Sequence, residues 1–151
     1  MKTFSKAFGL AGLRLGYGIA CKAIIENLRK VSQPFNINSM AIVAGMSSLL
    51  RLGHYHRIIQ QTCQGRLYLE KKLQSLEIPF IPSQANFIMV YVKNAQEATQ
   101  FLAKRGLFVR DLTSFGLREY IRVTISNHEH NRLFVEAMKE YILLKATNKG
   151  K

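Results

Sequence analysis

The hydrophobic period of the chain changes at Pro79, and the two sides of this residue predict different structures. Before it, after an opening strand pattern within 13–19, apolar residues recur at helical spacing over 22–32, 38–52 and 54–77. After it, the pattern predicts strands over 87–92, 107–110 and 120–125, and helices over 95–105 and after a capping box at Ser126. This order predicts an α/β sandwich, in which helices cover a small sheet.

Several polar residues and glycines mark the expected ends and weak points of these helices. Asn38 or Ser39, and Asn94, each precede a helical pattern and can accept hydrogen bonds from its first free N–H groups. Ser126 and Glu129 have the spacing of a capping box before the last helix. Gly65 interrupts the longest helical pattern at a cost of about 1 kcal/mol relative to Ala.

Charge and hydropathy exclude some classes of function. Lys and Arg number 22 against 9 Asp and Glu, a formal net charge of +13 at pH 7. The basic residues are spread along the whole chain without a nucleic-acid-binding motif, so we expect no nucleic-acid partner. No apolar run approaches the ~18 residues of a membrane span, and the N-terminus lacks a signal-peptide pattern. We therefore expect a cytoplasmic protein with no membrane partner.

The cysteines and histidines do not suggest a redox or metal site. Cys21 and Cys63 are too far apart for a CxxC motif, so we expect small buried residues in a reducing compartment. Two histidine pairs, His54–His56 and His128–His130, have a spacing of two residues that splays side chains apart on a helix. We therefore expect no metal site.

The segment 3–17 carries the residues with the clearest chemistry. Ser5 offers a hydroxyl, Lys6 an amine, and Arg14 a guanidinium, and two glycines between them let the backbone fold back. An amine can form a Schiff base with an aldehyde. A guanidinium beside a hydroxyl can bind phosphate oxygens. An aldehyde at one end and a phosphate at the other are the features of pyridoxal phosphate, which the segment is therefore suited to bind.

This segment resembles the lysine motif of the fold-type I, pyridoxal-phosphate-dependent aminotransferases, and within them the histidinol-phosphate aminotransferase branch. Further segments resemble that branch, so the resemblance covers nearly the whole chain. They are the segments 34–38, 82–87, 109–111 and 117–125.

The resemblance implies the following roles around the cofactor. Lys6 would be the Schiff-base lysine and the proton shuttle. Ser5 and Arg14 would hold the phosphate of the cofactor, with Thr3 nearby. Tyr17 is expected to be structural rather than catalytic.

The resemblance also implies the substrate-binding residues and the partners. Arg122 would bind the anionic end of the substrate, which is a carboxylate in most of the family and a phosphate in this branch. Arg110 would assist it, and Asn86 would help to shape the site. The substrates would be a small-molecule amino donor and a 2-oxo acid such as 2-oxoglutarate, and the family works as homodimers.

The fold class implied is α/β (α+β), the C-terminal part of a fold-type I transferase. Residues 1–53 would be the lysine-bearing end of the cofactor-binding large domain, and 54–78 a long connecting helix. Residues 79–146 would form the small α/β domain, and 147–151 a frayed tail.

One departure from the family limits what this chain is expected to do alone. The family's lysine lies past the middle of a much longer chain, whereas here it is residue 6. The aromatic residue that stacks on the cofactor and the carboxylate that pairs with its pyridine nitrogen would both lie upstream. We therefore expect a C-terminal fragment with impaired transaminase activity, exposed apolar helix faces, and aggregation or partner-dependent folding. The alternative is a non-catalytic small-domain module that binds an anion or a partner.

Overall fold

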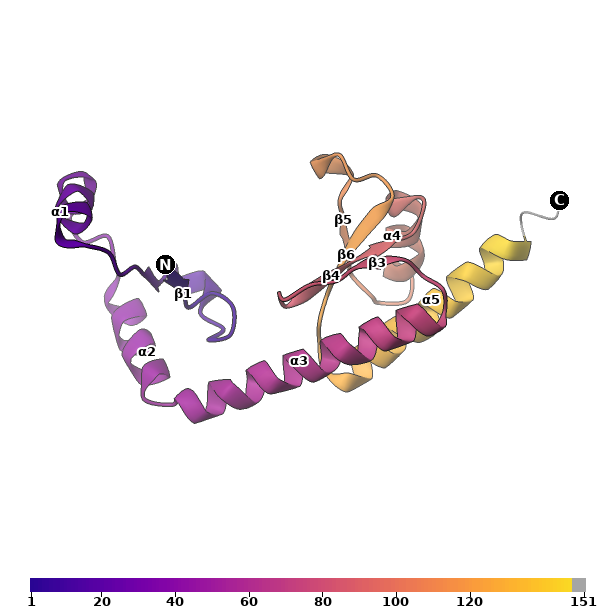
Figure 1. Cartoon of the computed structure of the whole chain (residues 1–151), viewed down its shortest axis with the longest axis horizontal. Coiled ribbons are helices and arrows are strands. Elements are labelled where there is room, and N and C mark those ends of the chain that lie inside the picture. The colour runs from indigo at the N-terminus through magenta and orange to yellow at the C-terminus, as the bar shows by residue number, and fades with distance from the viewer. Residues whose placement is uncertain (148–151) are drawn as a thin grey trace. The chain divides into compact units, whose positions relative to one another are not determined.

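The computed structural model describes residues 1–147, which form parts of two compact units, Met1–Ile59 and Gln60–Lys151 (Figure 1). The division between the units falls inside α3 (Leu52–Ser75), within the segment where we expected a long connecting helix. Of the tail expected to be frayed, residues 148–151 lie outside the described part of the chain.

The first unit consists of a short hairpin followed by helices. Its elements are β1 (Lys2–Thr3), a 3-10 helix η1 (Ala11–Leu13), β2 (Gly16–Tyr17), α1 (Lys22–Val31), α2 (Ser39–Leu49) and the start of α3. The predicted strand within 13–19 is therefore wrong in extent. The N–H groups of Leu13 and Arg14 bond to the nearby carbonyls of Leu10 and Ala11, so this stretch forms a tight turn instead of a ladder.

The helices of the first unit leave most of their apolar side chains exposed. No residue of α1 is buried, and Leu28 and Val31 are 54% and 79% exposed. In α2 only Ala41, Gly45 and Ser48 are buried. This confirms the expectation that these helices present apolar faces without a partner among the described residues.

The second unit contains one four-stranded antiparallel sheet with the strand order β3-β4-β6-β5. Its elements are β3 (Phe80–Ile81), β4 (Phe87–Tyr91), α4 (Ala95–Ala103), β5 (Arg110–Asp111), the 3-10 helix η2 (Thr113–Phe115), β6 (Tyr120–Thr124) and α5 (His128–Thr147). The strand expected over 107–110 begins only at Arg110, because the N–H of Leu107 bonds to the carbonyl of Leu102 and ends α4 instead. The mixed architecture confirms the predicted α/β class.

One face of this sheet supplies the core of the second unit. Side chains alternate between the two faces of a strand, and the register pairs Ile88 with Val123 and Val90 with Ile121 on the inner face. All four are buried, together with side chains from the three helices of the unit. Examples are Leu69 and Leu73 from α3, Leu102 from α4, and Met138 from α5. The apolar period read from the sequence therefore identifies a packed core in this unit.

Two of the three predicted helix caps are present as expected. The side-chain oxygen of Asn38 accepts from the N–H of Ala41, and that of Asn94 accepts from Glu97. The expected capping box at Ser126 is wrong by one residue, because α5 begins at His128 and Asn127 accepts from the N–H of His130.

Gly65 has a packing function that the sequence did not reveal. A Cβ atom at this position would lie 2.8 Å from Nδ2 of Asn131 and 3.0 Å from Cγ2 of Ile125. Asn131 is only 2% exposed, and its amide both accepts from the N–H of Ser126 and donates to its carbonyl. The glycine therefore allows α3 to approach the turn before α5 closely.

The two cysteines are less buried than expected. Both cysteines are free, but Cys21 is exposed and Cys63 is half-buried, so the expectation of two buried residues is wrong. Cys21 lies just before α1, whose apolar face is not covered by any described residue.

Within residues 1–147, no helix is long and apolar enough to cross a membrane. No group of three potential metal ligands gathers in that part of the chain.

Candidate functional site

The lysine segment forms a hairpin whose register brings the candidate cofactor-binding residues close together in the backbone. Thr3 pairs with Gly16, and the N–H of Phe4 donates to the carbonyl of Leu15 at 3.1 Å. Ser5 directly follows Phe4 and Arg14 directly precedes Leu15, so both residues lie next to this hydrogen bond. Lys6 follows at the start of the connecting loop with an exposed side chain.

The loop between Lys6 and Arg14 is fixed by its own backbone. The N–H of Gly9 donates to the carbonyl of Lys6 at 2.9 Å, and Gly9 has a left-handed φ of +69°, which glycine adopts without strain. Arg14 also has a left-handed φ, +54°, and its guanidinium donates to the carbonyl of Ala11 at 2.8 Å. Such a conformation is uncommon for an arginine.

Thr3 acts on the backbone beside the lysine. Its hydroxyl oxygen accepts a hydrogen bond from the N–H of Ser5 at 3.0 Å. This bond holds the backbone at Ser5 and leaves the Ser5 hydroxyl available on the same turn. Thr3 thus supports the backbone of the lysine segment.

An aromatic cluster that the sequence analysis did not find connects this hairpin to Tyr55 of α3. The ring of Phe4 is 4.7 Å from that of Phe8 and 6.0 Å from that of Tyr17, and Phe8 is 4.6 Å from Tyr55. Phe4 is buried, and these contacts flank Lys6 on both sides in sequence. The spacing of Phe4 and Phe8 around the lysine was the available signal. The role expected of Tyr17 as a structural residue is consistent with its place in this cluster.

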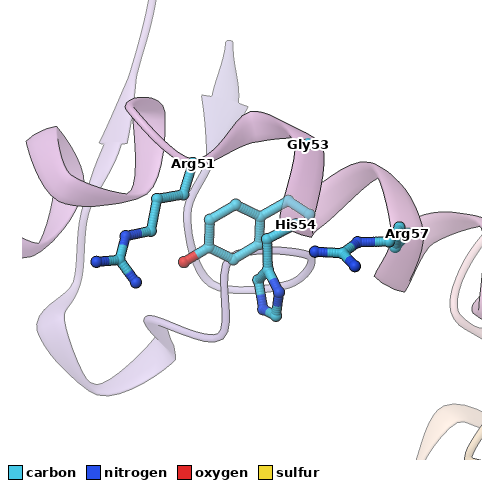
Figure 2. Close-up of a pocket in the computed structure, with 5 residues that line it drawn as sticks. Arg51, Gly53, His54 and Arg57 are labelled. Atoms are coloured by element: carbon cyan, nitrogen blue, oxygen red, sulfur yellow. The ribbon is translucent and has the colours of Figure 1, made fainter.

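Tyr55 also lines an open basic hollow of about 540 Å³ at the start of α3 (Figure 2). Arg51, Gly53, His54 and Arg57 complete its lining. The Tyr55 hydroxyl lies 3.1 Å from that of Ser48, which ties α3 to α2. None of the candidate site residues predicted from the sequence lines this hollow. The hollow is connected to the lysine loop through Tyr55, whose ring contacts that of Phe8.

In the second unit, the two candidate substrate-binding arginines are direct neighbours. Arg110 on β5 pairs in register with Arg122 on β6, so both side chains belong to the same face of the sheet. This outer face is opposite the core, and Arg122 is half-buried on it. Neither guanidinium forms an ion pair within the described residues. Like charges directly opposite each other destabilise a sheet, so the pair is suited to an anion.

Asn86 lies at a different place in the same sheet. It precedes β4, where its carbonyl accepts from the N–H of Ile125 at 2.9 Å, and its side chain is exposed. The strand register therefore groups the two arginines, whereas Asn86 lies outside the paired strands.

Polar groups beside the arginine pair are held by hydrogen bonds. The Tyr91 hydroxyl donates to Glu119 at 3.2 Å. Desolvation by neighbouring atoms raises the pKa of Tyr91, and the Glu119 carboxylate raises it further. A hydrogen bond from Thr113 lowers the pKa of Asp111, so this carboxylate stays charged at the end of β5. Tyr91 is thus kept protonated as a donor on the outer face.

The family model described as aminotransferase class I and II matches residues 1–138. The chain belongs to the class I and II aminotransferases. It is 40% identical over 139 residues to a histidinol-phosphate aminotransferase of Symbiobacterium thermophilum, a match that covers 91% of this chain and 38% of that protein. This aminotransferase chain therefore spans 38% of the length of that curated relative. The coverage confirms the expectation that it corresponds to part of a longer family member.

Solved aminotransferase structures show the same fold. The histidinol-phosphate aminotransferase from Clostridium acetobutylicum matches with a TM-score of 0.81 and 25% identity, covering 91% of this chain and 43% of that one. The histidinol-phosphate aminotransferase from Sinorhizobium meliloti, solved in complex with pyridoxal-5'-phosphate, matches with a TM-score of 0.77 and 22% identity. That match covers 93% of this chain and 40% of that one and concerns the fold alone.

The residues of the first unit fit the aldehyde and the phosphate of pyridoxal phosphate, but they lack a partner for its ring nitrogen. An amine for the aldehyde and a hydroxyl with a guanidinium for the phosphate are present in one hairpin. Glu26 is the only carboxylate side chain among residues 1–59, and it lies 3.8 Å from Lys22 in an exposed ion pair. This unit therefore supplies no separate carboxylate for the ring nitrogen.

Proposed function

We propose that this chain carries the cofactor-attachment and substrate-anion parts of a pyridoxal-phosphate-dependent aminotransferase of the histidinol-phosphate type. In this proposal Lys6 bears the cofactor, Ser5 and Arg14 bind its phosphate, and Thr3 holds the backbone between them. The observation that supports the proposal is the hairpin hydrogen bond between Phe4 and Leu15, because Ser5 and Lys6 directly follow Phe4 and Arg14 directly precedes Leu15. The relatives at about 40% identity support the reaction type.

Lys6 acts as the proton carrier of the reaction. Pyridoxal phosphate, when bound, supplies an electron sink that stabilises negative charge on the carbon being deprotonated. The Lys6 amine removes the proton from that substrate carbon and returns a proton during transfer. The aromatic cluster of the hairpin keeps the backbone of the lysine segment fixed while its amine moves. A fixed anchor restricts the amine to the geometries that allow proton transfer.

Arg122 and Arg110 bind the anionic group of the substrate in this proposal. A phosphate monoester offers the three oxygens and the charge that two neighbouring guanidiniums can share. Asn86, just before the start of β4, would help to shape the site. The amino donor is a phosphate-bearing amino compound, and the acceptor is a 2-oxo acid such as 2-oxoglutarate.

By itself the described chain should bind the cofactor weakly and transfer little or no amino group. The first unit lacks a free carboxylate for the ring nitrogen, which reduces the electron-withdrawing power of the ring. Assembly as a homodimer, as in the family, and a cytoplasmic location form part of the proposal. Two free cysteines support a reducing compartment.

The test is covalent trapping of excess pyridoxal phosphate on the purified chain. After borohydride reduction, peptide mass spectrometry should find the cofactor attached to Lys6, and Lys6→Ala should abolish that attachment and the visible absorption band. Lys2→Ala is the matched control, because Lys2 is an exposed lysine of the same hairpin. Equal labelling of Lys2 and Lys6 would show that the amine has no special position and would contradict the proposal.

A non-catalytic, anion-binding module is the second candidate. The observation that favours it is the core of the second unit, which packs helices and sheet without using the first unit. If Lys6→Ala and the unmodified chain respond identically to pyridoxal phosphate while Arg122 still determines phosphate binding, this second function is favoured.

A further inference from the structure

Each arginine of the neighbouring pair lies over its own aromatic ring. Cζ of Arg122 is 5.2 Å from the centroid of the Phe87 ring, and Cζ of Arg110 is 5.4 Å from that of Phe115. Both separations are within the ~6 Å at which a guanidinium is attracted to the face of a ring. The motifs read from the sequence assigned no role to either ring.

The backbone fixes where both rings stand. Phe87 pairs with Thr124, so it is the diagonal neighbour of Arg122 on the same face, at a spacing that aromatic side chains can bridge. Phe115 ends η2, whose first N–H, that of Thr113, donates to the Asp111 carboxylate at 2.7 Å. Gly116, with a φ of +80°, then turns the chain away. The rings therefore belong to ordered elements, whereas arginine side chains are long and flexible.

The pair needs such a restraint because nothing else in the described residues provides one. Arg110 and Arg122 repel each other across the strands, and neither has an acidic partner to hold it. A carboxylate would hold a guanidinium but would also neutralise it and compete with an incoming anion. A ring attracts the guanidinium through its quadrupole and leaves its charge intact.

We propose that Phe87 and Phe115 are positioning residues that hold the guanidiniums of Arg122 and Arg110 on the outer face of the sheet, ready for the anionic group of the substrate. This inference rests on the proposed function, because it concerns how the proposed anion-binding pair is organised. The rings reduce the conformational freedom that the arginines lose when the anion binds.

Arg105 provides an internal contrast. Its Cζ lies only 3.6 Å from the Phe101 ring centroid, but its guanidinium is also paired with the Glu140 carboxylate. That arginine is already neutralised and joins α4 to α5. Phe101 is therefore a matched aromatic control, next to an arginine with no expected role in anion binding.

The test measures inorganic phosphate binding to the full chain by NMR of the arginine Nε–H resonances. Arg122→Lys and Arg110→Lys assign the two signals and establish that phosphate binding depends on them. Phe87→Leu should shift the Arg122 resonance and weaken phosphate affinity about two- to five-fold, and Phe87→Tyr should restore both. Phe101→Leu should move the Arg105 signal and leave phosphate affinity unchanged.

Phe115→Leu keeps the test decisive if Phe87→Leu fails to fold. Phe115 is 62% exposed, so removal of its ring should leave the fold intact while weakening phosphate binding by a similar factor through Arg110. Unchanged affinity and unchanged arginine signals in both leucine variants would overturn the positioning role. If phosphate binding does not depend on Arg122 or Arg110, the anion-binding role in the proposed function fails as well, whereas trapping at Lys6 tests the cofactor role separately.

Discussion

The two units of this chain treat their apolar side chains in opposite ways. In the second unit, Leu73 and Ile121 have no exposed surface, and both belong to one core built from three helices and a sheet. In the first unit, Leu28 of α1 and Leu49 of α2 are 54% and 47% exposed. The comparison teaches that an apolar period predicts a helix face, but only a partner surface turns that face into a core.

Energetically, the two units should therefore differ in local stability. Short isolated helices are marginal in water, and most helical stability in proteins comes from packing of an apolar face. α1 spans 10 residues and buries none of them, whereas α3 buries Leu69 and Leu73 in the second unit. Exposed apolar patches of this kind also favour association. Aggregation or partner-dependent folding accordingly stays our prediction for the first unit.

The largest expected effect comes from truncating matched leucines in the two units. Leu73→Ala should reduce the free energy of unfolding by roughly 2–5 kcal/mol, because it opens a cavity in the core. Leu28→Ala should change it by less than about 0.5 kcal/mol, because the side chain is half exposed. Urea unfolding of both variants, followed by circular dichroism, measures the difference. Equal losses would mean that the face of α1 is also packed.

A smaller effect is expected from two glycines of α3, one on each side of the division between the units. Gly65→Ala should destabilise the chain by roughly 1–3 kcal/mol, because the methyl group meets Asn131 and Ile125. Gly53→Ala has no atom within 4 Å to meet and should be neutral or stabilising by up to about 1 kcal/mol through helix propensity. Thermal melting of the two variants gives the comparison. A stabilising Gly65→Ala would show that α3 does not approach Asn131 this closely.

The smallest effect should be a pH-dependent one confined to the second unit. Glu140 accepts from Nε of Arg105 at 2.9 Å, and this bond lowers the pKa of the Glu140 carboxyl. A lowered folded pKa means that the stabilisation is present above the unfolded pKa and is lost as the pH falls through the folded one. Glu140→Gln should therefore lower the melting temperature at pH 7 and have no effect below the folded pKa.

The control for this pH effect lies on the same helix. Glu136 pairs with Arg132 four residues away, within α5 alone, and both are exposed. Glu136→Gln should change the melting temperature less than Glu140→Gln, because it breaks no contact between α4 and α5. If the melting temperature of Glu140→Gln equals that of the unmodified chain at every pH, the Arg105–Glu140 pair does not stabilise the second unit.

The sequence by itself determined the order of the helices and of the strands after Pro79, helix caps near residue 38 and at Asn94, and the lysine segment with its hydroxyl and guanidinium. These features follow from local rules, namely the period of apolar residues, the hydrogen bonds that a side chain can offer to its own helix end, and residue types at fixed spacing. The family followed from the same local motifs, and the comparisons confirmed it.

Only the tertiary structure decided which apolar faces find partners, why position 65 is a glycine, and which rings lie near the arginines and the lysine loop. Gly65 and Asn131 are 66 residues apart in the sequence. Phe87 lies close to Arg122 because of the strand register and not because of sequence proximity. Such contacts depend on how distant segments pack, and no local period encodes that arrangement. The exposed faces of α1 and α2 have the same physical cause: burial depends on a second surface, and amphipathic sequence specifies only the first.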